Sequence, residues 1–170
     1  YRITTTEQQL LRTRGAEILA RAGQIARIVE LGPGSGEKLV TLLAAAPRPD
    51  VAVHLVDISA AALAKATAAL ADAALTLVPH QATYEEGLAH IGREPAAAGR
   101  TLVAFLGSNI GNFDPPGVDA FLRSVRATLR PGDALLLGTD LVKPEAELLL
   151  AYDDPLGVTA AFNRNLLVRV

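Results

Sequence analysis

The sequence predicts an α/β fold in which a doubly wound, mostly parallel sheet has helices on both faces. Short apolar, β-branched segments alternate with longer segments rich in alanine and leucine. Such alternation is typical of parallel strands joined by right-handed helical crossovers. The first strand-like segment runs into the glycine-rich turn ELGPGSG at residues 30–36. Ligands of open α/β sheets bind beyond the carboxyl ends of the strands, so we expect a binding site at this turn.

Capping residues and apolar periodicity define the elements of the first half. Thr4 lies three residues before Glu7, the spacing of a capping box, so a helix is expected to begin there and to end at Gly23. Alternating or β-branched segments predict strands, and alanine-rich segments predict helices, one of which has Ser59 as its N-terminal cap. In order, they are a strand at 27–31, a helix at 37–46 ended by Pro47 and Pro49, a strand at 51–57 and a helix at 59–73.

The second half continues the same alternation. Pro79 lies within the strand predicted at 75–83, which favours an irregular or edge position because proline has no amide hydrogen to donate. The remaining predictions are a helix at 84–92, a strand at 101–107, a helix at 117–129, a strand at 133–141 and a helix from Pro144 to 154. The chain has no methionine, and its last residues resemble a helix or strand that is cut short. We interpret residues 1–170 as one domain, truncated at its C-terminus.

Composition excludes several classes of function. Half of the 170 residues are hydrophobic and one fifth are charged, as expected for a soluble globular domain. No apolar run reaches the roughly 18–20 residues of a membrane span, and the polar start does not resemble a signal peptide, so we expect a cytoplasmic protein without a membrane partner. The net charge of −2 argues against a nucleic-acid partner. Without cysteine, and with His54, His80 and His90 scattered along the chain, no metal site is expected.

The glycine turn favours one class of cofactor over another. A dinucleotide fingerprint, G-x-G-x-x-G, would place its third glycine at Glu37, whose charge would repel a pyrophosphate. The spacing from Glu30 is instead E-x-G-x-G-x-G, which resembles the first motif of class I S-adenosylmethionine (SAM) methyltransferases. Asp57, at the end of the second strand, could accept hydrogen bonds from ribose hydroxyls. Two alternatives stay open: a purely structural glycine turn, and Asp57 as the cap of the following helix.

The chain as a whole resembles a more specific family. The segments ELGPGSGEK, TYEEGL, GSNIGNF, LLLGTDLVKP and AYDDPLGVTAAFNRNLL occur in the order typical of the histidine-specific SAM-dependent methyltransferases. The resemblance implies a class I, Rossmann-like methyltransferase fold with SAM as cofactor and L-histidine as substrate. It implies an enzyme that methylates the α-amino group of histidine and forms Nα-trimethylhistidine (hercynine), the first step of ergothioneine biosynthesis.

Site residues follow from this resemblance by position. It assigns cofactor contacts to Gly32, Gly34, Lys38, Asp57, Thr83 and Tyr84, and contacts with the amino-acid end of histidine to Asn112 and Tyr152. It assigns no single catalytic residue. Two features depart from the family pattern: threonine stands at 83, where aspartate is usual, and Arg2 follows Tyr1, where relatives often have a second tyrosine. The family's imidazole-reading glutamate and serine would lie beyond residue 170, so we expect residues 1–170 alone to bind SAM weakly and to methylate poorly.

The chemistry of methyl transfer agrees with an amide at residue 112. The attacking amine must lose its proton, and a nearby carboxylate would favour the charged, unreactive ammonium, so Asn112 is preferred to Asp114 as the substrate contact. The alternatives are that Asn112 caps a helix or holds a turn, that Tyr152 only packs, and that Lys38 is an ordinary surface lysine; Asn109 is expected to be structural. For the whole chain, methylation of another amino acid or small amine, or a non-catalytic SAM-binding module, also stays open.

Overall fold

The computed structural model describes residues 2–47, 50–71, 75–95 and 98–169. The chain divides into two compact units, Arg2–Thr139 and Asp140–Val170. The first unit contains the sheet and the glycine turn, and the second contains two helices.

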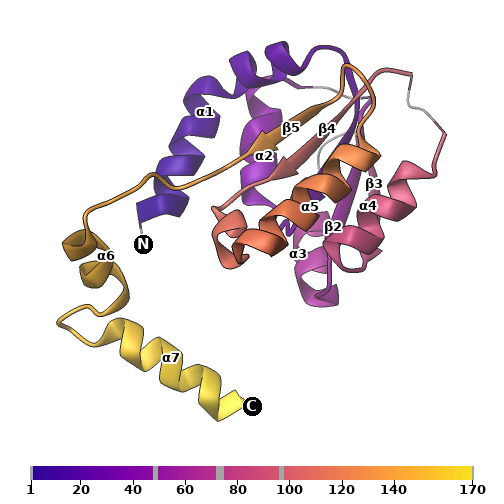
Figure 1. Ribbon diagram of the computed structural model, residues 1–170. Coiled ribbons are helices and arrows are strands. Elements are labelled where there is room, and N and C mark those ends of the chain that lie inside the picture. Colours follow the sequence, from indigo (N-terminus) through magenta and orange to yellow (C-terminus); the bar gives the residue numbers. More distant parts are fainter. Residues whose placement is uncertain (1, 48–49, 72–74, 96–97, 170) are drawn as a thin grey trace. The chain divides into compact units, whose positions relative to one another are not determined.

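The first unit is built on a five-stranded, all-parallel sheet (Figure 1). Its strands are β1 (Ile25–Leu31), β2 (Ala52–Asp57), β3 (Thr76–Gln81), β4 (Arg100–Phe105) and β5 (Ala134–Leu137). Their order is β3-β2-β1-β4-β5, so the chain winds outward from β1 to one edge and then returns to build the other. This order confirms the doubly wound prediction, and it confirms that Pro79 lies on an edge strand, β3.

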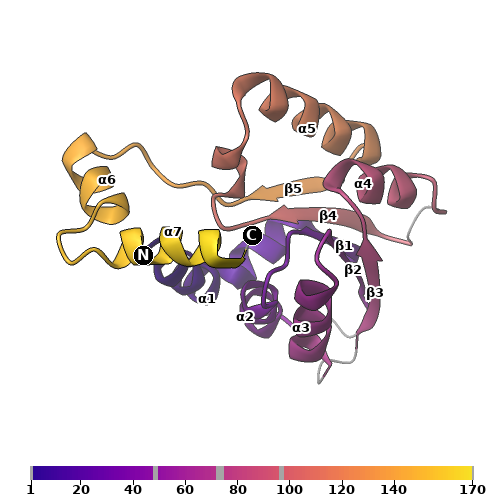
Figure 2. The same cartoon turned by 90° about the horizontal axis from the view of Figure 1, so that it is seen from below.

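Helices cover both faces of this sheet (Figure 2). One face packs against α1 (Arg2–Ala22), α2 (Glu37–Ala45) and α3 (Ala60–Leu70), and the other against α4 (Tyr84–Gly92) and α5 (Pro115–Thr128). Successive side chains of β2 alternate between the two: Val53 and Leu55 join the first apolar cluster, and Val56 joins the second. The central strands β1 and β4 are buried almost throughout because helices cover them on both sides.

The helix boundaries confirm most of the capping predictions and correct one. Ser59 caps α3 by accepting a hydrogen bond from the amide of Ala62, and Gly23, with φ of 82°, ends α1. Thr4 is not a cap, because α1 already begins at Arg2 and Thr4 lies inside it. The Glu7 carboxylate therefore contacts groups elsewhere in the fold. Pro49 and the predicted end of α3 at 72–73 lie outside the described residues.

The second unit consists of α6 (Glu145–Tyr152) and α7 (Val158–Arg169). Pro144 stands immediately before α6, as its fixed φ favours. The C-terminal segment, for which the sequence left helix and strand open, is the helix α7. Strand β5 is shorter than the predicted 133–141 and ends at Leu137. Among the described residues, no helix combines the length and apolar character needed to span a bilayer.

Candidate functional site

The turn after β1 has a backbone that only glycine adopts easily. Gly32, Gly34 and Gly36 have φ values of 67°, 58° and 79°, which lie in the left-handed region. A Cβ atom on Gly36 would lie 2.9 Å from the Cα of Ala66, so this glycine also permits the close approach of α3. A Cβ on Gly34 would meet nothing within 4 Å. The turn is therefore closed against α3 at one end and open at Gly34, where a ligand could reach its backbone.

Glu30, at the end of β1, is a carboxyl group buried without full compensation. Its residue is 2 % exposed, and its Oε2 atom has no hydrogen-bond partner among the described residues. Burial raises the pKa of Glu30 from 4.5 to about 8, although the nearby Lys38 ammonium acts in the opposite direction. The folded protein therefore holds Glu30 mainly protonated at neutral pH. A cationic ligand beside it would favour its ionised form.

Glu7 joins the first helix to both sides of the candidate site. Its Oε2 atom lies 2.7 Å from Nζ of Lys38, and its Oε1 atom accepts a hydrogen bond of 2.8 Å from the backbone amide of Gly107. The Lys38 side chain is only 23 % exposed, so it is not an ordinary surface lysine. Sequence reasoning assigned Glu7 to a capping box and missed this role, because Gly107 lies 100 residues away and no local pattern links the two.

The loop after β4 brings the side-chain amide of Asn109 close to the glycine turn. Gly107 and Ser108 have φ values of 86° and 59°, and Ser108 is the non-glycine residue with positive φ in the described part of the chain. A short 3-10 helix, η1 (Asn109–Asn112), follows. The Nδ2 atom of Asn109 lies 3.6 Å from the position of a Cβ on Gly32. Strained backbone of this kind persists where the surrounding structure holds it, often at ligand sites.

The two asparagines of this loop occupy different environments. Asn109, expected to be structural, is half-buried beside Gly32, whereas Asn112 is exposed at the end of η1. Asn112 does not cap the next helix: Asp114 caps α5 by accepting a 2.9 Å hydrogen bond from the amide of Gly117. The structure thus removes helix capping as an alternative for Asn112 and identifies Asn109 as the amide that lies beside Gly32.

A cavity of about 210 Å³ lies next to this loop at the ends of β2 and β3. Its walls are formed by six residues that combine carboxylates, hydroxyls, two aromatic rings and one aliphatic side chain: Asp57, Ile58, Thr83, Tyr84, Glu85 and Phe113. Asp57 does not cap α3, since Ser59 does. The Oδ1 atom of Asp57 accepts a 2.8 Å hydrogen bond from the amide of Ser59 and is thereby oriented at the strand end.

Thr83 and Tyr84 differ in how they reach this cavity. Thr83 caps α4 in a reciprocal capping box with Glu86, which engages its hydroxyl and its amide. The Tyr84 ring packs edge-on against Phe105, with ring centres 5.3 Å apart, while its hydroxyl lies 2.8 Å from the position of a Cβ on Gly32. Burial and the charge of Asp57 raise the Tyr84 pKa, so the hydroxyl stays a neutral hydrogen-bond donor.

Six of the eight predicted site residues therefore surround the carboxyl ends of β1, β2 and β3: Gly32, Gly34, Lys38, Asp57, Thr83 and Tyr84. Asn112 lies on the loop after the neighbouring strand β4. Tyr152 belongs to α6 in the second unit. Its proposed contact with substrate stays a prediction.

Comparisons with known proteins identify the family of the chain. The family described as histidine-specific, SAM-dependent methyltransferases matches residues 1–170. The chain belongs to this family. It is 46 % identical over 172 residues to histidine N-alpha-methyltransferase of Mycolicibacterium smegmatis, with 100 % of this chain and 53 % of that protein covered. It is 44 % identical to the Mycobacterium tuberculosis protein of the same name, with 98 % and 52 % covered. The chain thus spans about half the length of these relatives.

A solved structure confirms the fold. Human N-acetylserotonin methyltransferase, in complex with SAM, superposes with a TM-score of 0.53 over 86 % of this chain and 41 % of that one, at 14 % identity. At this identity the likeness concerns the fold alone, a class I SAM methyltransferase fold, as the family resemblance implied.

The residues of this histidine-specific methyltransferase family member fit SAM, which is a cation at its sulfonium. Glu30 offers a buried carboxyl whose Oε2 atom has no partner among the described residues, and ionisation of this group would be stabilised by a nearby positive charge. Gly34 leaves open backbone at the turn. Asp57 stands at the wall of the adjoining cavity, where a ribose could be held by its carboxylate.

Proposed function

We propose that this chain supplies the cofactor site and part of the substrate site for methylation of the α-amino group of L-histidine to Nα-trimethylhistidine, within ergothioneine biosynthesis. The observation that supports it best is the contact between the loop of η1 and the glycine turn. Asn109 lies beside Gly32 and Gly107, so the amide-bearing loop and the proposed cofactor turn border the same space. The proposal also draws on the names of the two mycobacterial relatives.

The proposed reaction depends mainly on orientation. SAM supplies a sulfonium-activated methyl group, and the protein must align an unprotonated amine behind it. Asn109 and Asn112 are neutral, so they can donate and accept hydrogen bonds without stabilising the ammonium form of the amine. The nearest acid of the loop, Asp114, is engaged in capping α5. Glu30 is buried in β1 and is proposed to balance the cofactor's positive charge rather than to bind substrate.

Lys38 and Glu7 have a positioning role in this proposal. Their ion pair ties α2, which follows the glycine turn, to α1, while Glu7 holds the amide of Gly107 at the start of the substrate loop. The glycine turn and the loop that begins at Gly107 are thereby held in fixed relative positions before any ligand binds. Preorganisation of this kind lowers the cost of aligning two reactants.

A second candidate function keeps SAM and changes the acceptor to another amino acid or small amine. Arg2 favours it, since this residue stands where the family often has a tyrosine near the substrate. Mass spectrometry of products formed from SAM and a panel of amino acids by the full-length protein distinguishes the two. Appearance of mono-, di- and trimethylated histidine supports the first function, and turnover of another amine without turnover of histidine overturns it.

Asn112→Ala in the full-length protein tests the substrate loop. The histidine KM is expected to rise at least tenfold while the Kd for SAM, measured by calorimetry, changes less than twofold. Asn163→Ala on α7 is a matched asparagine control in the other unit, expected to leave both constants unchanged. Equal losses of SAM and histidine binding in Asn112→Ala would mean that this residue only maintains the loop.

A further inference from the structure

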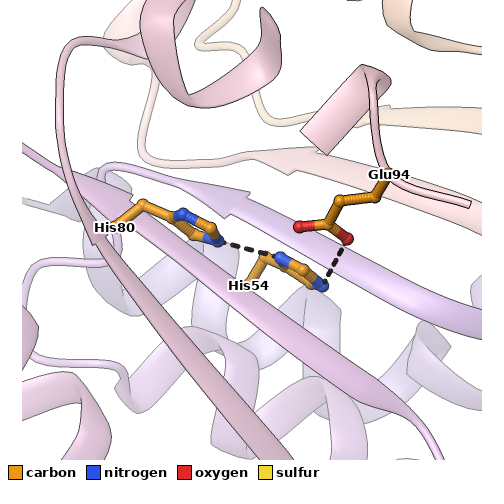
Figure 3. A group of neighbouring side chains, drawn as sticks. All are labelled: His54, His80 and Glu94. Atoms are coloured by element: carbon orange, nitrogen blue, oxygen red, sulfur yellow. Dashed lines mark hydrogen bonds and ion pairs between the residues drawn. The ribbon is translucent and has the colours of Figure 1, made fainter. Parts of the chain in front are cut away.

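Three ionisable side chains that are far apart in the sequence meet on the α4 face of the sheet (Figure 3). His54 is in β2, His80 is in the edge strand β3, and Glu94 follows the end of α4. His54 has the same orientation as Val56, which packs against α4, because alternate residues of a strand share a face. We call this group the His–His–Glu cluster. None of its members belongs to the candidate site described above.

The donor atoms of the His–His–Glu cluster are close enough to share one ion. One donor atom from each residue lies within 4.8 Å of the other two. Nδ1 of His54 and Nε2 of His80 are 2.9 Å apart, and Nε2 of His54 lies 3.8 Å from Oε2 of Glu94. Ligands around a tetrahedral zinc ion at bond lengths near 2 Å lie about 3.3 Å apart. A single ion binds only one nitrogen of the His54 ring. Because one donor atom from each residue already lies within 4.8 Å of the other two, side-chain rotations would bring these three atoms to a metal-binding spacing.

Burial prepares both imidazoles for metal binding. His54 is 4 % exposed, and desolvation lowers its pKa to about 4; burial also lowers the pKa of His80. Both rings are therefore neutral at pH 7, and a metal ion does not have to displace a proton from an imidazolium. In the structure the two rings satisfy each other through one hydrogen bond, which a bound ion would replace.

Arg27 is the group that opposes a cation here. It forms an ion pair of 3.0 Å with Oε2 of Glu94 and donates a hydrogen bond to the backbone carbonyl of Pro95. A bound ion has to share or displace this guanidinium. His90, at the end of α4, is exposed, and its ring centre lies 5.4 Å from that of His80.

We propose that the His–His–Glu cluster binds a divalent transition-metal ion of borderline softness, with zinc as the natural candidate. Two imidazoles and one carboxylate suit zinc, cobalt or nickel, whereas magnesium and calcium require mainly oxygen ligands. The site is separate from the proposed methyl-transfer site: His54 precedes Asp57 by three strand residues, or about 10 Å. A bound ion would tie the edge strand β3 to β2 and to the segment after α4, so its expected effect is on stability.

The test is calorimetric titration of the metal-free, untagged full-length protein with Zn²⁺, and with Co²⁺ followed by its visible absorption. We expect one ion per cluster, and a loss of at least tenfold in affinity for His80→Gln and for Glu94→Gln. These partly exposed positions are chosen in preference to the buried His54. His90→Gln is the matched histidine control, with expected affinity unchanged.

Arg27→Gln separates metal binding from a purely structural cluster. It removes the competing positive charge, so it is expected to tighten zinc binding severalfold, whereas loss of structure would weaken it. The proposal is overturned if zinc does not bind at micromolar concentrations, if His80→Gln and Glu94→Gln bind it as well as the parent protein, or if His90→Gln loses as much affinity as they do. A rise in Tm with zinc that both ligand variants abolish supports it.

Discussion

Replacement of Glu30 by glutamine tests whether the protein keeps a destabilising carboxyl group for its cofactor. The residue is 2 % exposed, and burial raises its pKa to about 8 from an ordinary value of 4.5. Glutamine has nearly the same shape but does not ionise. Glu30→Gln is therefore expected to remove the pH dependence that this group gives to the stability, with little change in packing.

The sign and magnitude follow from proton linkage. Between pH 4.5 and 8 the folded state binds the Glu30 proton and the unfolded state releases it, so the free energy of unfolding falls as the pH rises through this window. From pH 4.5 to 7 the loss amounts to about 3 kcal/mol, at one proton per molecule. Over the same pH interval, the free energy of unfolding of Glu30→Gln should rise by about 3 kcal/mol relative to that of the parent protein. Because each protein is compared with itself at the two pH values, any difference in packing between the parent and the variant cancels.

Urea denaturation of both proteins at pH 4.5 and pH 7 measures this difference. Glu17→Gln is the control, because Glu17 is a half-exposed glutamate on α1. The pH dependence of its free energy of unfolding should match that of the parent protein. An equal pH dependence in the parent and Glu30→Gln would refute the reasoning. The same substitution should weaken SAM binding at least tenfold in calorimetry at pH 8.5, since it removes the carboxylate proposed to balance the sulfonium.

Two further substitutions test how the fold holds the site. Glu7→Ala removes the partly buried partner of Lys38 and the acceptor of the Gly107 amide. It should lower the free energy of unfolding by about 1–3 kcal/mol, as measured in urea. Gly87→Ala places a Cβ against Cγ1 of Val56 at the α4–β2 contact and should lower it by about 1–3 kcal/mol. Gly92→Ala in the same helix meets nothing closer than 3.7 Å, so it should be neutral or slightly stabilising.

The controls make both results decisive. Glu7→Gln keeps an acceptor for the amide of Gly107 but loses the charge, so it should cost less than Glu7→Ala. Identical losses would mean that the hydrogen bond adds nothing. Equal effects of the Gly87 and Gly92 substitutions would show that helix propensity, and not the contact with β2, determines their cost.

Local patterns in the sequence predicted those parts of the protein whose causes are local. Strand periodicity, the glycine turn and the cap at Ser59 depend on residues a few positions apart, and the structure confirms each. The capping box predicted at Thr4 was wrong because the same spacing occurs inside a helix. In the folded protein the Glu7 carboxylate instead forms an ion pair with the Lys38 ammonium and accepts a hydrogen bond from the Gly107 amide. The sequence could not predict that Lys38 and Gly107 lie close to Glu7, since their proximity depends on the strand order.

The sequence by itself therefore determined the fold class, the family and the ends of strands at which the predicted cofactor residues stand, because these depend on periodicity and on motifs contiguous in the chain. Only the tertiary structure decided which distant groups meet. It placed Asn109 at the glycine turn, left Glu30 without a full complement of partners, and gathered His54 and His80 on adjacent strands. Parallel pairing sets neighbours by register across crossovers, so residues that are scattered along the chain become a cluster only when the sheet is assembled.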